Sequence, residues 1–263
     1  DPIESNYTRQ VKNACLSNVA PTPSGNPSLV HVSKEMANDL GITEEDTKTD
    51  EFLKLVSGAI VYPNTKPYAM CYGGHQFGHW AGQLGDGRAI NLFEVNHNRK
   101  QWAVQLKGAG KTPYSRTADG LAVLRSSVRE YLCSEAMFHL GVPTTRALSL
   151  SLSGDQVLRD ILYDGNPADE NGAIVSRVAP SFIRFGNFQI LTAQNDIENL
   201  KKLTDYTIHH FYSHLGKPCK EVYVQFIKEV GEKTMAMILD WERVGFVHGV
   251  MNTDNMSILG LTI

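Results

Sequence analysis

The chain has 263 residues, a formal net charge of −3 and 42% hydrophobic residues. This composition is typical of a folded globular protein and excludes a disordered or fibrous chain, and the small net charge does not indicate a nucleic-acid or membrane partner. No apolar run is as long as a bilayer span, and the first ten residues resemble neither a signal peptide nor a transit peptide. We expect the chain to be a fragment of a longer protein, because it stops at GLTI within an expected strand.

The four cysteines are Cys15, Cys71, Cys133 and Cys219, and no two of them form a C-x-x-C pair. Scattered thiols in a chain that is long enough to build its own core are typical of reduced, structural residues. We therefore expect a reducing compartment and no zinc site.

The N-terminal part of the chain is expected to be a supporting segment. Residues 1–28 contain four prolines and indicate an extended arm. A short strand is predicted for Leu29–Val32, followed by a helix that Ser33 caps and that runs to Leu40. A second helix is predicted from Thr43 to near Gly58, with acidic residues in its first turn.

The next segment predicts a β-hairpin. Residues 68–87 are rich in glycine and aromatic residues, and Ala89–Val95 and Trp102–Lys107 then alternate in the manner of strands. His97-Asn98 is predicted as the turn that joins them, which makes the two strands antiparallel partners.

The remaining elements indicate an α+β fold. A helix is predicted from Asp119 or Gly120 to Gly141, and two strands at 147–152 and 173–178 are expected to be joined by the polar loop DGNPADENG. Helical patterns then cover 197–215 and 221–244. Strands followed by helices predict two lobes: an antiparallel sheet with one long helix, then a helical lobe that is incomplete here.

Lys107 is the first candidate for a functional residue. It ends an apolar strand directly before Gly108-Ala109-Gly110, which permits two interpretations. It is either an exposed charge on an edge strand or a phosphate-binding lysine as in kinase-like sites. The turn Gly85-Asp86-Gly87-Arg88 precedes the neighbouring strand, and its backbone N–H groups are able to approach phosphate oxygens, although glycines in a loop commonly serve only the backbone conformation.

Glu130 is a candidate partner for Lys107, because a carboxylate on the following helix is able to hold a strand lysine toward phosphates. Glu135 on the same helix is a rival, and an ordinary surface position is equally compatible with the sequence.

The segment HGVMNTDN resembles a kinase catalytic loop, in which an Asn that binds metal follows the His by seven residues. Asn255 follows His248 by seven residues, whereas Val250 stands where a kinase has its catalytic Asp. Valine neither accepts a proton nor binds a metal ion, so ordinary kinase chemistry would lack its base. A polar turn between a helix and a strand is the alternative.

Two arginines in SRVAPSFIRFGNF are further candidates for phosphate binding. Arg177 is expected at the end of a strand and Arg184 in the loop that follows. They either clamp phosphates through paired hydrogen bonds or form salt bridges between the lobes.

Taken together, YGGHQFGHWAGQLGDGRA, VQLKGAGKTPYSRTADGLAVLRSSVREYLCSEAM, GVPTTRALSL, SRVAPSFIRFGNF and HGVMNTDNMS resemble the selenoprotein O (SelO) family of protein adenylyltransferases. The resemblance implies a pseudokinase with a protein-kinase-like fold that binds ATP in a reversed orientation. It also implies transfer of AMP to Ser, Thr or Tyr hydroxyls of proteins, with Mg²⁺ as cofactor and pyrophosphate as the leaving group.

The resemblance also implies roles for single residues. The nucleotide contacts that it implies are Gly85, Gly87, Arg88, Lys107, Asp119, Gly120, Arg177 and Arg184. Glu130 would pair with Lys107, Asp254 would accept the proton of the attacking hydroxyl, and Asn255 would bind magnesium. The expected division is an arm with scaffold helices at 1–66, a kinase-like lobe at 67–190 and the start of a helical lobe at 191–263.

The resemblance further implies that a second metal-binding aspartate, in a D-Y-G-type motif, follows the last residue given, and that a redox-active Sec or Cys lies near the end of full-length relatives. We therefore expect the 263-residue chain alone to be weakly active or inactive. A eukaryotic parent would be mitochondrial and a bacterial one cytoplasmic. A conventional kinase and a non-catalytic pseudokinase scaffold are the alternative functions.

Overall fold

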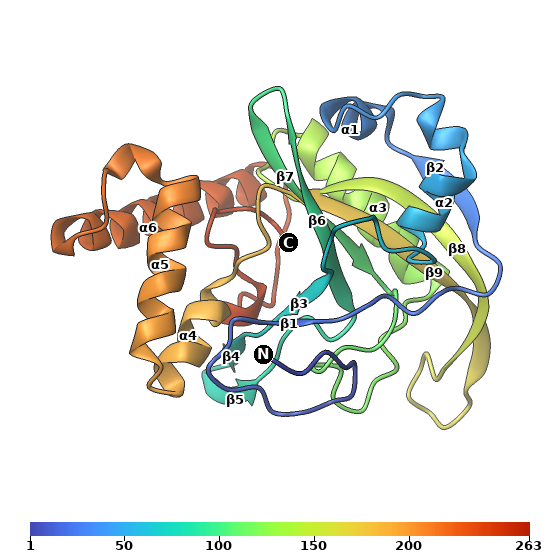
Figure 1. Cartoon of the computed structure of the whole chain (residues 1–263), viewed down its shortest axis with the longest axis horizontal. Helices are drawn as coiled ribbons and strands as arrows, with labels where there is room; N and C mark the ends of the chain where they lie inside the picture. Colours follow the sequence, from blue (N-terminus) through green and yellow to red (C-terminus); the bar gives the residue numbers. More distant parts are fainter.

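The computed structural model describes residues 1–263 and consists of a large sheet beside a group of helices (Figure 1). The strands of the large sheet are β1 (Leu16–Asn18), β2 (Ser28–Val32), β3 (Tyr68–Met70), β6 (Ala89–His97), β7 (Lys100–Lys107), β8 (Arg146–Arg159) and β9 (Ala168–Ala179). A separate hairpin comprises β4 (Gly73–Gln76) and β5 (His79–Gln83). The α-helices are α1 (Lys34–Asp39), α2 (Asp50–Val56), α3 (Leu124–His139), α4 (Phe185–Ala193), α5 (Ile197–Phe211) and α6 (Lys220–Arg243). Three short 3₁₀ helices are η1 (Asp46–Lys48), η2 (Ser213–Leu215) and η3 (Thr253–Asn255).

The large sheet has seven strands in the order β1-β3-β6-β7-β9-β8-β2, and each neighbouring pair is antiparallel. Helix α3 lies against β8 and β9. Helices α4, α5 and α6 form the second part of the molecule, on the left in Figure 1. The predicted α+β class with an antiparallel sheet, one long helix and a helical part is confirmed.

The β6–β7 hairpin places Lys107 in the middle of the sheet. Its turn is at Asn98 and Arg99, both with positive φ, of 50° and 62°. Two such residues form the turn type that matches the twist of a hairpin. The predicted turn at His97-Asn98 is thus one residue early. Lys107 lies opposite Ala89 of β6 on one side and Val175 of β9 on the other, so the interpretation as an edge charge is wrong.

Helix α3 begins at Leu124, and the prediction of a start at Asp119 or Gly120 is wrong. Gly120 has a φ of +76°, which is outside the helical region and belongs to a turn. Leu121 and Val123 instead form isolated β-bridges with Ala109 and Gly172 before the helix begins. One face of α3 packs on the sheet through Tyr131, which is buried with Val175. This apolar contact fixes the direction in which the rest of the helix faces.

Two other element boundaries differ from expectation. The helix predicted from Thr43 to Gly58 is divided into η1 and α2, because Thr49 adopts an extended conformation and its side chain accepts a hydrogen bond from the Phe52 N–H to cap α2. The polar loop predicted between β8 and β9 is shorter than expected. Residues 168–172 belong to β9, and the two strands pair as far as Arg159 and Ala168 to form a projecting arm.

The helical part has its own core, in which Ile183, Ile208, Tyr212, Phe226 and Ile258 are buried together. The Tyr212 hydroxyl donates a 2.6 Å hydrogen bond to the Ile258 carbonyl, which ties the C-terminal segment to α5. Helix α4 was not predicted. Its apolar residues surround the helix without an amphipathic period, and such a segment cannot be recognised by periodicity.

The expected domain boundaries stay predictions. Strands β1 and β2 come from the segment expected as an arm and scaffold, and they form the two edges of the large sheet. None of the helices is both long enough and apolar enough to pass through a bilayer.

Candidate functional site

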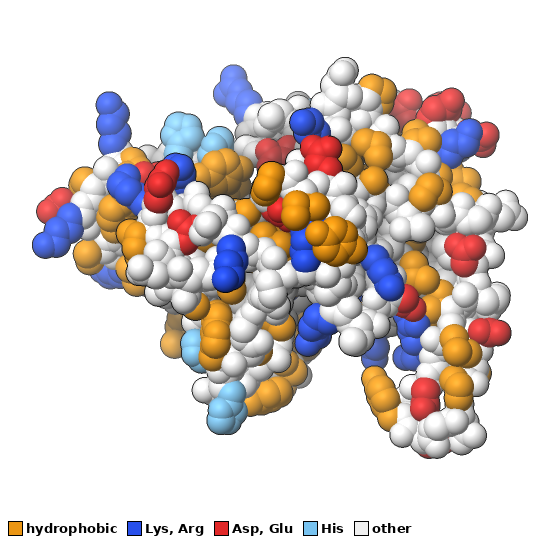
Figure 2. All heavy atoms as spheres, turned by 60° about the horizontal axis from the view of Figure 1, so that its bottom comes forward, with side chains coloured by type: hydrophobic (Ala, Val, Ile, Leu, Met, Phe, Trp, Pro, Cys, Tyr) orange, Lys and Arg blue, Asp and Glu red, His pale blue; other side chains and the backbone are white.

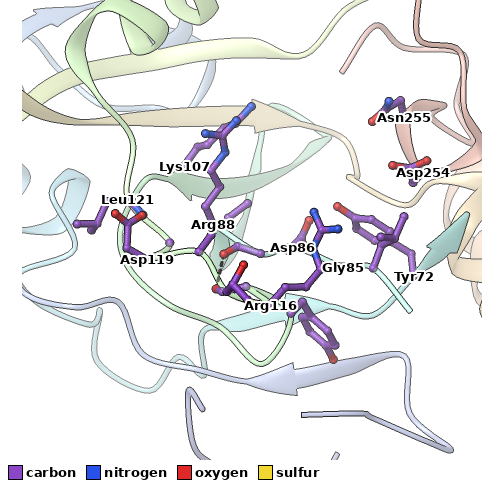
Figure 3. A pocket seen from close by; sticks show the side chains of 18 of the residues that line it. Tyr72, Gly85, Asp86, Arg88, Lys107, Arg116, Asp119, Leu121, Asp254 and Asn255 are labelled. Atoms are coloured by element: carbon purple, nitrogen blue, oxygen red, sulfur yellow. Dashed lines mark hydrogen bonds between the residues drawn. The ribbon is translucent and has the colours of Figure 1, made fainter. Parts of the chain in front are cut away.

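A cavity of about 730 Å³ lies between the sheet, the α4 N-terminus and the segment that contains η3. Apart from Glu130, every predicted site residue lines it: Gly85, Gly87, Arg88, Lys107, Asp119, Gly120, Arg177, Arg184, Asp254 and Asn255. In Figure 3, Asp254 and Asn255 lie on one side of this cavity and Lys107 and Asp119 on the other. On the face shown in Figure 2, Lys and Arg side chains gather beside a hollow next to the arm that projects at the lower right.

Lys107 and Glu130 form an ion pair with 2.7 Å between Nζ and Oε2. The lysine comes from β7 and the carboxylate from α3, so the pair joins the sheet to the helix. Each side chain remains 24% exposed, which leaves the ammonium group open to the cavity. Burial lowers the pKa of Lys107 to about 8, although the nearby carboxylate acts in the opposite direction. The side chain is therefore mostly charged at neutral pH.

Glu130 holds two cations at once. Its Oε1 lies 3.1 Å from Nη1 of Arg177, while Oε2 contacts Lys107. Burial opposes ionisation of this carboxyl group, but the two cations outweigh it and lower its pKa to about 2. Arg177 also donates two hydrogen bonds to Oε1 of Gln105 and lies over the Phe182 ring. The arginine is thus fixed at the cavity wall.

Glu135 is excluded as the partner of Lys107. It accepts two 2.8 Å hydrogen bonds from the guanidinium of Arg146 and a further bond from Ser33. These contacts direct it toward β8 and the start of α1. Its role is structural, and the two carboxylates of α3 have different partners because they lie on different sides of the helix.

The glycine turn fits tightly against the segment that follows β7. Gly85 has a φ of +136°, and a Cβ atom there would collide with the Tyr114 ring. A Cβ atom on Gly87 would lie 2.9 Å from the Tyr114 carbonyl oxygen. The absence of side chains thus permits this backbone to approach both Tyr114 and the cavity. Arg88 follows directly and is exposed.

Asp119 and Gly120 lie in the turn before α3 and line the cavity, as Figure 3 shows for Asp119. Two guanidinium nitrogens of Arg159 donate to Asp119 at 2.7 and 2.9 Å. A Cβ atom on Gly120 would collide with the carbonyl of Gly110, so only glycine fits this turn. Arg159 comes from the projecting β8–β9 arm and was not predicted, because the sequence gives no sign of a pair that is 40 residues apart.

Arg184 is the N-cap residue of α4, and its side chain reaches two elements. Nη1 donates a 2.7 Å hydrogen bond to the Asp254 carbonyl, and Nη2 lies 3.7 Å from Oδ1 of Asp86. Its guanidinium also lies over the Tyr72 ring. Asp86 is buried, and burial raises its pKa even though Arg184 acts in the opposite direction. Asp86 and Tyr72 are two further members of the site for which the sequence analysis proposed no role.

The segment from His248 to Asn255 folds into a compact turn that ends in η3. His248 stacks on Trp241 with ring centres 5.2 Å apart. Asn255 donates from Nδ2 to the Val250 carbonyl at 3.1 Å, which leaves its Oδ1 available to a ligand. Val250 lines no part of the cavity.

Asp254 is buried beside β4. Its Oδ2 accepts a 3.1 Å hydrogen bond from Nε2 of Gln76, whereas its Oδ1 is buried without a partner. The β4 contact was also missed by the sequence analysis, because Gln76 and Asp254 are 178 residues apart.

The donor atoms near η3 are oxygens, which are the ligands that Mg²⁺ prefers. Asn255 offers one free amide oxygen, its Oδ1. No group of three or more His, Cys, Asp or Glu residues is placed to hold a metal ion. The residues present thus fit part of a magnesium site of the kind in which phosphates and water complete the coordination.

The comparison with known families agrees with this geometry. The model of the family described as "Protein adenylyltransferase SelO" matches residues 4–263. The chain belongs to the SelO family. The chain is also similar to curated SelO relatives named protein nucleotidyltransferase YdiU, with 65% identity over 263 residues to the protein of Flavobacterium johnsoniae and 60% over 269 residues to that of Rhodopirellula baltica. A third, from Methylobacillus flagellatus, is 57% identical over 265 residues.

Each alignment covers all of this chain, but the chain spans only about half the length of these relatives, namely 50%, 50% and 51%. The SelO-family segment described here includes the whole cavity-lining set discussed above. The sheet and the α4–η3 region place Lys107, Arg184 and Asp254 around one cavity, and Glu130 of α3 pairs with Lys107.

Proposed function

We propose that the full-length protein containing this chain transfers AMP from ATP to hydroxyl groups of proteins. The observation that carries the proposal is the set of residues that line the cavity. The cavity brings Asp254 together with Lys107 and Arg184, whereas Val250, at the position of a kinase catalytic base, has a side chain without an acceptor atom and lies outside it. The family description and the names of the relatives support a nucleotidyltransferase.

In the proposed reaction, the oxygen of a Ser, Thr or Tyr hydroxyl attacks the α-phosphorus of ATP. A new phosphorus–oxygen bond forms, the bond to the bridging oxygen breaks, and pyrophosphate leaves with that electron pair. Asp254 accepts the hydroxyl proton. The ammonium of Lys107 and the guanidinium groups of Arg177 and Arg184 stabilise the negative charge that builds up on the leaving group.

The other site residues have supporting roles in this proposal. Glu130 orients Lys107 toward the phosphates. The backbone of Gly85 and Gly87, with Arg88, binds the nucleotide, and Asp119 and Gly120 form the opposite wall. Asn255 would hold magnesium through Oδ1, and when bound the ion would neutralise phosphate charge.

The position of the retained label tests the proposal directly. Full-length protein with magnesium is incubated with a protein acceptor and ATP labelled at either the α- or the γ-phosphate. Incorporation of the α label alone supports adenylyl transfer. Incorporation of the γ label supports a conventional kinase instead, and incorporation of neither supports a non-catalytic nucleotide-binding protein.

Two variants identify the groups that act. Lys107→Met is expected to weaken nucleotide binding, and Asp254→Asn is expected to abolish transfer while nucleotide still binds. If both variants retain transfer at the wild-type rate, the assignment of the site is wrong. We further propose that this 263-residue chain alone is weakly active or inactive and that a bacterial parent protein is cytoplasmic.

A further inference from the structure

The β4–β5 hairpin contacts the η3 segment through three successive residues. The His75 N–H donates to Oγ1 of Thr253 at 3.0 Å, and the Phe77 N–H donates to Oδ1 of Asn252 at 3.1 Å. Between them, Nε2 of Gln76 donates to Oδ2 of Asp254 at 3.1 Å. The end of β4 and the first residue of the hairpin turn therefore run along the segment that carries the proposed proton acceptor and are joined to it by three hydrogen bonds.

The tip of this hairpin has an unusual backbone. Phe77 has a φ of +50°, which is uncommon for a bulky residue, and Gly78 follows with a φ of +83°. Such a conformation persists where surrounding contacts determine it. The hydrogen bond from the Phe77 N–H to Asn252 is such a contact, and it holds the hairpin in register with η3.

The opposite side of the Asp254 carboxylate is fixed by shape. Oδ1 is buried against Gly74, where a Cβ atom would lie 2.8 Å from this oxygen. Oδ1 thus occupies the space that a side chain at position 74 would need. Gln76 and Gly74 thus define the same orientation through two different kinds of contact.

We propose that β4 is the positioning element for the proton acceptor, with Gln76 as the positioning residue. Gln76 and Asp254 both line the cavity. Because Oδ1 is buried, Oδ2 is the carboxylate oxygen that would lie nearest to the hydroxyl of a bound protein substrate. A carboxylate oxygen has two lone pairs, so Oδ2 accepts the Gln76 hydrogen bond on one and remains open on the other.

The inference rests on the proposed function. In that reaction the hydroxyl proton moves to the free lone pair of Oδ2 as the hydroxyl oxygen bonds to the α-phosphorus and the bridging oxygen leaves with pyrophosphate. Gln76 forms and breaks no bond and keeps its hydrogen bond to Oδ2 throughout.

The test uses Gln76→Met in the full-length protein, because methionine keeps the length of the side chain and removes the N–H donor. Without the hydrogen bond from residue 76, the Asp254 carboxylate is no longer held toward the hydroxyl, and kcat is expected to fall by about 10- to 100-fold. The KM for ATP and the melting temperature are expected to stay at their wild-type values. Gln76→His, which restores an N–H donor, is expected to recover part of kcat. Gly74→Ala is expected to lower kcat in the same way by displacing Oδ1.

Gln83→Met is the matched control. Gln83 lies on β5 of the same hairpin but bonds to the N-terminal arm, at the Arg9 carbonyl and the Val11 N–H. This variant is expected to keep its kcat. The inference is overturned if Gln76→Met keeps the wild-type kcat, if Gln83→Met loses as much, or if the histidine variant recovers nothing. Absence of AMP transfer by the wild-type protein would instead contradict the proposed function.

Discussion

Lys107 of β7 and Glu130 of α3 form an ion pair at 2.7 Å, although the helix itself packs on β8 and β9. Because each belongs to a different element, the position of the ammonium group depends on how the helix packs on the sheet. The carboxylate also holds Arg177, so the loss of one cation leaves it with the other. The pair therefore couples α3 to the wall of the cavity that carries Lys107 and Arg177.

Replacing Lys107 by methionine is expected to weaken ATP binding by about 10- to 100-fold, since a hydrogen bond to a charged group contributes about 1.5–3 kcal/mol. Calorimetric titration with ATP measures the change. Lys100→Met is the control, because Lys100 lies at the other end of the same strand and is exposed. Equal affinity of the Lys107 variant and the wild type would contradict a phosphate-binding role.

The affinity for ATP is expected to fall as the pH rises above about 8. Burial lowers the pKa of Lys107 to about 8 in the unliganded protein, so the side chain loses its charge above this pH. Bound phosphate favours the charged form, which makes binding take up a proton in this range. Dissociation constants measured from pH 7 to pH 10 provide the test. Lys107→Arg, which stays charged, should give a much flatter curve, and equal slopes would refute the assignment.

Glu130 is expected to contribute to acid sensitivity. Its pKa falls from 4.5 to about 2 on folding because of Lys107 and Arg177. Its contribution to the free energy of unfolding is therefore complete above pH 4.5 and is lost as the pH decreases toward 2. The shift corresponds to about 3 kcal/mol at most. Urea unfolding over this pH range should show a smaller loss of stability for Glu130→Gln than for the wild type. Glu221→Gln, at an exposed position of α6, should behave as the wild type does.

Gly85→Ala is expected to destabilise the fold by roughly 3 kcal/mol or more, because it adds a collision with the Tyr114 ring to the strain of a positive φ. Gly165→Ala separates the two effects. Gly165 has a φ of +85° but open space around it, so this variant should lose only about 1–2 kcal/mol. Chemical denaturation gives both values. Similar losses in the two variants would show that the close approach of Tyr114 is unimportant.

The sequence predicts the local parts of the site well. Alternation in residues 102–107 identifies the strand of Lys107, and the kinase-like spacing of His248 and Asn255 identifies the η3 segment. The residue pattern alone left Glu130 and Glu135 open, and only the family resemblance implied Glu130. In the structure, packing brings Glu130 to Lys107 and Glu135 to Arg146.

The contacts that support the site are not visible in a local pattern. Asp86 with Arg184, Asp119 with Arg159 and Gln76 with Asp254 each join different elements. Helix α4 has no predicted counterpart because it is apolar on all sides. The predicted first residue of α3 lies too early in the chain because the turn at Gly120 has no effect on hydrophobic periodicity. Such features depend on which surfaces meet after folding.

Both edges of the seven-stranded sheet come from the first 32 residues, since β1 pairs with β3 at one edge and β2 with β8 at the other. Removing this N-terminal segment would leave β3 and β8 with unpaired backbone groups on opposite sides of the molecule. Exposed strand edges are templates for pairing between chains. The N-terminal segment therefore covers both edges of the large sheet, and we expect shortened forms of the protein to self-associate even though the cavity residues are retained.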